Sequence, residues 1–143
     1  MKARRRARAV ALQTLFEVDM TTHDPFRVLD QRMQDCTLDQ NSAEFTRHLV
    51  EGVLQNLPQL DLIIQEIAPE WPFDQMSPVD RNILRIAIFE MLFDPDIPVK
   101  VAINEAVELA KLFGSESSRR FVNGALGTLA SKEMAKETYS EDK

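Results

Sequence analysis

The sequence has very few of the residues that build disulfide or metal frameworks. Its single cysteine, Cys36, excludes an internal disulfide and indicates a reducing compartment, for which we expect the cytoplasm. The two histidines, His23 and His48, lack a Cys or His at ligand spacing, so we expect no metal site. No apolar run approaches the roughly 20 residues that span a membrane. A chain of 143 residues with 44% hydrophobic side chains therefore fits one globular domain.

The motifs of common enzyme classes are also missing. The sequence contains no HExxH, CxxC or GxSxG pattern, and its four glycines form no loop with phosphate-binding spacing. Cys36 ends an apolar stripe and is interpreted as a small core residue, not a nucleophile. We therefore expect no catalytic residue and no cofactor.

Strand patterns are absent too, and nearly every segment repeats its apolar residues with helical period. The expected fold class is all-α: one domain of seven helices over residues 1–135 and a polar tail at 136–143. Capping residues and prolines place the helix starts, with Asp24, Ser42, Ser77 and Ser115 as predicted N-caps. The predicted helices cover 3–20, 25–36, 42–57, 60–67, 78–93 and 99–113, and the last follows Ser115 and frays after Ser131.

The predicted helix at 78–93 is the candidate centre of the fold. Between Ile83 and Phe93 its only polar residues are Arg85 and Glu90. A helix that is apolar on nearly all sides is expected to be buried. Charged residues inside it need partners, so structural ion pairs are expected for both.

Charge is distributed unevenly, and this is the most informative feature present. Five of the first eight residues are basic, whereas the other 135 residues hold the remaining 12 Lys and Arg against all 23 Asp and Glu. Positive charge at a helix start opposes the helix dipole, so stability alone does not explain it. Arginine binds phosphate and stacks on bases, which predicts an RNA-binding end on an acidic body. These residues are Lys2, Arg4, Arg5, Arg6 and Arg8.

A second basic segment, Arg119 and Arg120, precedes Phe121, a candidate ring for base stacking. Gly124 and Gly127 follow in the same predicted helix, where each costs about 1 kcal/mol relative to alanine. Close packing against another helix is the favoured interpretation of these glycines. The alternative is the close approach of a ligand backbone beside Asn123.

Four stretches together resemble the NusB family of transcription antitermination factors. They are Arg4–Gln13, Ser77–Ile86, Val101–Lys111 and Phe121–Leu126, in the family's order and spacing. The resemblance implies a seven-helix fold of two packed subdomains. It also implies binding of single-stranded boxA RNA in ribosomal RNA leaders, with the ribosomal protein NusE as partner and the elongating RNA polymerase as target.

Site residues follow from the same resemblance. The arginine run and the segment Arg119–Asn123, with Phe121 and Asn123, match the family's RNA-binding surface, while Phe16 and Asp80 match its protein-partner surface. Gln75 departs from the family pattern, since relatives commonly have a basic residue there, and the body is unusually acidic. Self-association as a homodimer is left open.

Two alternatives to an RNA-binding adaptor remain at this point. NusB-like domains also occur in RNA cytosine methyltransferases, but such an enzyme needs a Rossmann-like domain with a Gly-rich cofactor loop, which these 143 residues lack. The other alternative is a helical module that binds only proteins. The arginine run disfavours it.

Overall fold

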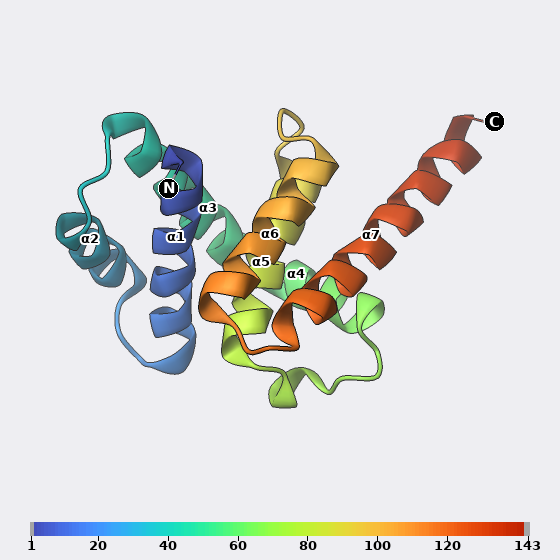
Figure 1. The fold of residues 1–143 in the computed structure, drawn as a ribbon, viewed down its shortest axis with the longest axis horizontal. Helices are drawn as coiled ribbons and strands as arrows, with labels where there is room; N and C mark the ends of the chain where they lie inside the picture. Colours follow the sequence, from blue (N-terminus) through green and yellow to red (C-terminus); the bar gives the residue numbers. More distant parts are fainter. Residues whose placement is uncertain (1, 142–143) are drawn as a thin grey trace.

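The computed structural model describes the backbone of residues 2–141 and the side chains of residues 2–136. Over this part the chain forms seven α-helices and one short 3-10 helix, with no strand (Figure 1), which confirms the all-α prediction. None of the described helices has the length and hydrophobicity of a membrane span. The elements are α1 Ala3–Met20, α2 Pro25–Asp35, α3 Gln40–Gln55, α4 Leu57–Ile67, η1 Phe73–Gln75, α5 Pro78–Phe93, α6 Val99–Phe113 and α7 Ser118–Glu141.

The helices form two groups that pack against each other. Helices α1, α2 and α3 contact one another, and α4, α6 and α7 pack around α5. Figure 1 shows the first group on the left and the second on the right. The groups are joined because α1 contacts both α5 and α6, and α3 contacts α5. This arrangement agrees with the expected two subdomains of a single domain.

Several helix starts follow the predicted capping chemistry. The carboxylate of Asp24 accepts a hydrogen bond from the backbone N–H of Arg27, and the hydroxyl of Ser77 accepts from the N–H of Asp80. Prolines occupy the first turns of α2, α4 and α5, where a missing N–H costs nothing. Pro58 falls in the gap between the predicted helices at 42–57 and 60–67, but it lies inside the first turn of α4.

The predicted cap of α3 is wrong by three residues. Asp39 caps this helix, and its Oδ1 accepts from the N–H of Ser42 at 2.8 Å. Ser42 is buried in the first turn and is not the cap. The polar run at 37–41 resembles a loop in sequence, but its second half already belongs to the helix.

Helix α7 also differs from its prediction at both ends. It begins at Ser118, and the N–H of Ser115, the expected cap, donates to Ser118 Oγ at 2.9 Å. Its backbone stays helical to Glu141, ten residues beyond the predicted fraying point, and Figure 1 shows this end extending away from the body. Residues 136–141 of the predicted tail are thus helical, while Asp142 and Lys143 lie outside the described residues.

The core forms around α1 and α5. Every residue from Asn82 to Glu90 is buried, as predicted for the central helix, and α1 is buried over Ala7–Leu12. Helix α3 approaches α5 so closely at Gly52 that an added Cβ would run into the ring of Phe89. Glycine is therefore required at that position for the two helices to make contact.

Two sets of ion pairs hold α1 against α5. Arg8 donates to both carboxylate oxygens of Glu90 at 2.8 and 2.7 Å, with side-chain exposures of 5% and 1%. Near the other end of α1, Asp19 accepts from Arg81 at 2.7 Å and from Asn82 at 3.0 Å. Low residue numbers on α1 face high ones on α5, so the helices run antiparallel.

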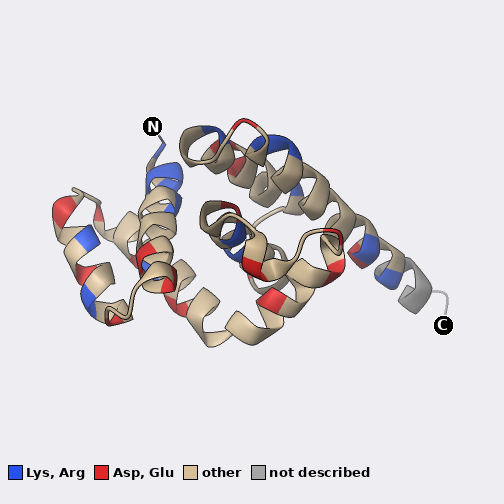
Figure 2. Ribbon diagram, turned by 90° about the horizontal axis from the view of Figure 1, so that it is seen from below, with Lys and Arg blue, Asp and Glu red and all other residues tan. Residues whose placement is uncertain are grey.

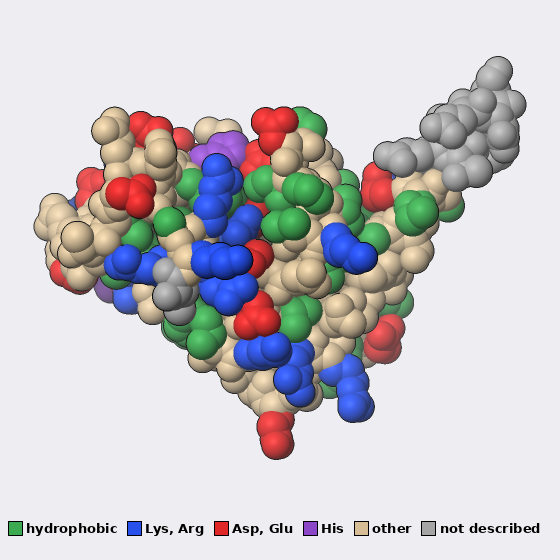
Figure 3. Space-filling model, turned by 45° about the horizontal axis from the view of Figure 1, so that its top comes forward, with side chains coloured by type: hydrophobic (Ala, Val, Ile, Leu, Met, Phe, Trp, Pro, Cys, Tyr) green, Lys and Arg blue, Asp and Glu red, His purple; other side chains and the backbone are tan. Residues whose placement is uncertain are grey.

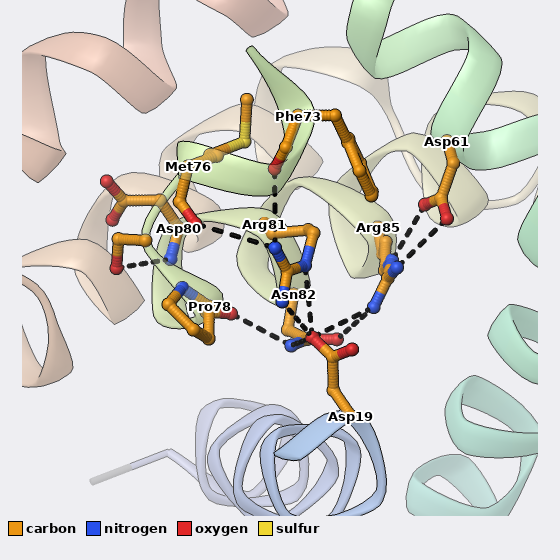
Figure 4. A network of polar contacts seen from close by, with 10 residues as sticks. Asp19, Asp61, Phe73, Met76, Pro78, Asp80, Arg81, Asn82 and Arg85 are labelled. Carbon is orange, nitrogen blue, oxygen red and sulfur yellow. Dashed lines mark hydrogen bonds and ion pairs between the residues drawn. The ribbon is translucent and has the colours of Figure 1, made fainter. Parts of the chain in front are cut away.

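The Asp19 contacts extend to α4 and to the connector before α5 (Figure 4). Arg85 donates to both oxygens of Asp61 on α4, at 2.8 and 2.9 Å. Arg81 also donates to the carbonyl oxygens of Phe73 and Met76. The expected ion pairs for Arg85 and Glu90 are therefore present, and each residue has a partner on a different helix.

Removing one member of the buried Arg8–Glu90 pair should be costly. We expect Arg8→Met to lower the free energy of unfolding by about 3–5 kcal/mol, because it leaves the Glu90 carboxylate buried without a partner. The double variant Arg8→Met with Glu90→Leu should recover most of this loss. Urea denaturation measures both variants, and a loss under about 1 kcal/mol for the single variant would contradict the structural role.

Candidate nucleic-acid interface

The first turn of α1 presents a group of cations to solvent. Lys2, Arg4 and Arg6 are exposed, and Arg5 is partly exposed. The first turn contains no acidic residue, and the N-cap, Lys2, provides no side-chain hydrogen bond. Figure 2 shows the basic residues together at the start of the chain. We call Lys2, Arg4, Arg5 and Arg6 the α1 cation group.

Neighbouring elements orient these side chains. The guanidinium carbon of Arg4 lies 4.0 Å from the centre of the Phe45 ring on α3. Arg6 Nη2 donates to the carbonyl oxygen of Thr37 at 3.0 Å. The ring attracts the cation, and Arg4 remains exposed to solvent. The α1 cation group therefore has a defined shape on the surface.

Arg5 connects the group to α6. Its Nε and Nη2 donate to the two oxygens of Glu105 at 2.9 and 3.0 Å. The hydrogen bond from Arg5 lowers the pKa of Glu105, outweighing its partial burial, and the charges of Arg5, Arg8 and Lys2 act in the same direction. The same contact raises the pKa of Arg5. Arg5 thus serves as a tether between helices as well as a surface charge.

Arg8 does not belong to this exposed surface, in contrast to the surface position that its predicted role as an RNA contact requires. Its side chain is almost fully buried, and the forked pair with Glu90 occupies its Nε and Nη2. Arg8 lies one helical turn further into the fold than Arg4. Arg4 is exposed and Arg8 is buried because Arg4 lies at the solvent-facing end of α1 and Arg8 lies where α1 packs on α5.

The start of α7 presents the second group of polar and cationic side chains. Arg119, Arg120 and Asn123 are exposed, and they line a hollow of about 670 Å³ together with Asn104 of α6. We call Arg119 and Arg120, with the neutral Asn123 beside them, the α7 cation group. Asn104 is adjacent in sequence to Glu105, the partner of Arg5. Figure 3 shows basic side chains spread over one face, with acidic ones between them.

Phe121 is only partly exposed, and its ring meets that of Trp71 edge to face at 6.0 Å. Sequence reasoning did not select Trp71 as a site residue, although it is 53% exposed in the connector between α4 and η1. Gln75 lines the same pocket as these two rings. The sequence signal for Trp71 is that it is the single tryptophan of the chain, placed between Pro69 and Pro72 in a segment that joins two helices.

The glycines of α7 do not pack closely, contrary to the favoured interpretation. A Cβ at Gly124 or Gly127 would meet no atom within 4 Å among those described. The alternative, that this stretch of helix leaves space for a ligand beside Asn123, stays a prediction.

The two predicted partner residues have different environments. Phe16 is 37% exposed and lines a small apolar hollow of about 210 Å³ with Leu12, Val79 and Phe113. Asp80 was expected near the surface, but it is only 8% exposed and lies between α5 and the start of α7. The expectation was wrong because α7 covers the first turn of α5. Burial raises the pKa of Asp80.

No group of three or more metal-ligating side chains occurs among the described residues. His48 instead pairs with Asp94 at 2.7 Å, and His23 contacts Glu17 at 3.0 Å. Cys36 is half-buried at the end of α2. The two cation groups are therefore the main chemical feature of the described surface.

These features define an all-helical protein with the kind of cationic surface that binds a polyanion. The model of the NusB family matches residues 5–131, and the chain belongs to this family. It is 50% identical over 141 residues to the transcription antitermination protein NusB of Chloroflexus aggregans, which covers 97% of this chain and 94% of that protein.

Solved structures support the same family. A structure of T. maritima NusB is 36% identical and has a TM-score of 0.86, covering 97% of this chain and 98% of that chain. A structure of the antitermination factors NusB and NusE in complex with double-stranded RNA has a TM-score of 0.84 over 92% of this chain and 98% of that one. Its identity is 23%, so this likeness concerns the fold alone.

The Arg5–Glu105 tether predicts a pH dependence of stability. A carboxyl whose pKa is lower in the folded state stabilises the fold above its ordinary pKa, and the contribution is lost as pH falls through the folded-state value. We expect the unfolding free energy to fall as pH drops below the ordinary pKa of a glutamate, about 4.3. Glu105→Gln should make this fall shallower in chemical denaturation at each pH. Equal pH slopes in both proteins would contradict the tether.

Proposed function

We propose that this protein is a non-enzymatic antitermination factor that binds single-stranded boxA RNA of ribosomal RNA leader transcripts. In this role it acts together with the ribosomal protein NusE and links the RNA to elongating RNA polymerase. The observation that carries the proposal is the pair of exposed cation groups on α1 and α7, on either side of α6, on a body whose net charge is negative. The transcription role of its named relatives supports the same reading.

The charge distribution favours binding at this face and disfavours it elsewhere. The chain carries a formal net charge of −6, so most of its surface repels a polyanion. Phosphates are attracted where cations gather, and each contact releases counterions. The start of α1 keeps these cations although they oppose its helix dipole, which indicates a role other than stability.

The proposed partner surface is the apolar hollow around Phe16. An exposed aromatic ring among Leu12, Val79 and Phe113 is an anchor of the kind that protein interfaces use. A NusB of the same fold has been solved together with NusE and RNA, which supports a protein partner beside an RNA surface. The buried position of Asp80 leaves Phe16 as the candidate contact.

RNA binding should depend on the α1 cation group through its charge. We expect the triple variant Lys2→Gln, Arg4→Gln, Arg6→Gln to bind a boxA-type RNA more weakly. Its log–log salt slope should be smaller by about 0.7 for each lost phosphate contact. Fluorescence anisotropy over a salt series measures both effects, and the same series on a duplex compares single-stranded with double-stranded RNA.

The matched control for this experiment is Arg27→Gln, which removes an exposed cation on α2, beyond the opposite end of α1. Melting temperature should stay level in the triple variant, because relief of the α1 dipole offsets the lost contacts of Arg4 with Phe45 and of Arg6 with Thr37. A salt slope equal to that of the wild type would place the RNA elsewhere.

Partner binding should depend on Phe16. We expect Phe16→Ser to weaken NusE binding by about 2 kcal/mol or more, because a central aromatic anchor is lost. Binding of RNA by the protein alone should not change. Isothermal titration with NusE measures the effect, and Phe26→Ser, which alters a ring exposed on α2, is the control. Equal affinity in Phe16→Ser and wild type would exclude this hollow as the interface.

A further inference from the structure

A second pocket adjoins the α7 cation group and differs from it in chemistry. It has a volume of about 450 Å³, within the usual range for small-molecule sites, and lies between the connector before α5 and the start of α7. Its walls include Trp71, Met76 and Phe121, with Gln75 and Arg120 beside them. The buried Asp80 also lines it. Arg120 borders both this pocket and the hollow of the α7 cation group.

The two rings leave an aromatic surface available for stacking. Trp71 and Phe121 meet edge to face, with an interplanar angle of 72°, so they do not cover each other's faces. Trp71 remains 53% exposed. Stacking of an unpaired base on such a ring is a main source of affinity for single-stranded nucleic acid. Because about half of the Trp71 side chain stays exposed, its burial contributes less to folding stability than that of a core tryptophan.

Asp80 contributes a hydrogen-bond acceptor, one of whose oxygens has no donor in the described part of the chain. Its Oδ1 is buried and has no hydrogen-bond partner among the described residues. Burial raises the pKa of this carboxyl, and the Ser118 hydroxyl at the start of α7, which lies near it, acts in the opposite direction. Figure 4 shows its carboxylate turned away from the Asp19, Arg81 and Arg85 contacts. An unpaired buried carboxylate oxygen destabilises the free protein, and a ligand that donates an N–H would relieve this cost.

We propose that this pocket receives one unpaired RNA base that carries an amino group, namely adenine, cytosine or guanine. The base stacks on Trp71 and Phe121, its amino group donates to Asp80, and its phosphate lies toward Arg120. The oxygen of Asp80 is buried in the free protein, so insertion has to displace side chains that line the pocket. This inference rests on the proposed function and gives it a base-selective subsite.

Uracil is the base that this chemistry rejects. It has no amino group, and its one N–H lies between two carbonyl oxygens. Those oxygens would face the Asp80 carboxylate and be repelled by it. A carboxylate accepts readily from an exocyclic amino group such as that of cytosine. The pocket therefore selects at one position of the RNA, whereas the cation groups bind phosphate regardless of sequence.

The test uses Trp71 as an internal reporter, since it is the only tryptophan in the chain. A boxA-type RNA is titrated while tryptophan emission and fluorescence anisotropy of labelled RNA are both followed. We expect RNA to quench the emission. In a series of RNAs with one base at a time replaced by uridine, one replacement should reduce affinity about tenfold and diminish the quenching.

Two variants separate the pocket from the rest of the surface. Asp80→Asn should remove or reverse the penalty for uridine at that one position, because its amide donates to a carbonyl, while the salt slope stays unchanged. Trp71→Leu should lower affinity about tenfold, and Phe26→Leu, which alters an exposed ring on α2, should not. Thermal melting of each variant checks that the fold is intact.

The outcomes distinguish this inference from the proposed function. If RNA binds with the expected salt slope but leaves Trp71 emission unchanged, or if Asp80→Asn keeps the wild-type base preference, the pocket inference is wrong and the proposed function stands. If NusE quenches Trp71 and RNA does not, the pocket belongs to a protein partner. If the wild-type protein binds no RNA, both fail.

Discussion

The fold depends on the contact between α1 and α5. The buried Arg8–Glu90 pair and the Asp19 contacts join these helices near their two ends, and the helices belong to different groups. A buried ion pair tolerates little displacement, because separating its charges in a poorly solvated interior costs several kcal/mol. The two groups are therefore held at a defined angle and register, and no other helix joins them by buried charges of this kind among the described residues.

This constraint sets the geometry of the candidate RNA surface. Because α1 is held against α5 and, through Arg5 and Glu105, against α6, the α1 cation group keeps a fixed place relative to the start of α7. Cations that oppose the dipole of α1 would fray an isolated helix. The burial of the next two turns, from Ala7 to Leu15, offsets that cost. Stability supplied by the core thus permits a cationic surface that is locally unfavourable.

The agreement between prediction and structure follows the strength of the local signal. Helices α1 and α6 have the predicted bounds, and Ser77 with Pro78 marks the start of α5, because apolar period and capping chemistry coincide there. Where two signals compete, the prediction failed. Ser42 resembles a cap but lies within the first turn of α3, and Ser115 precedes α7 by three residues. No other helix of the described chain packs against Gly124 and Gly127 of α7, and this depends on the tertiary arrangement of the helices, not on the local sequence.

By itself, the sequence determined the helical class, the number of helices, the buried character of α5 and the cationic start of the chain, since each of these depends on residues close together in sequence. Only the tertiary structure decided what each charged residue does. The partners of Arg5 and Arg8 lie 100 and 82 residues away, so no local pattern distinguishes them from Arg4 and Arg6. Likewise, Asp80 is buried because α7 folds over it, and Trp71 meets Phe121 only when the connector is in place. Burial and pairing are properties of the folded chain, because long-range packing alone determines which side chains lose their water.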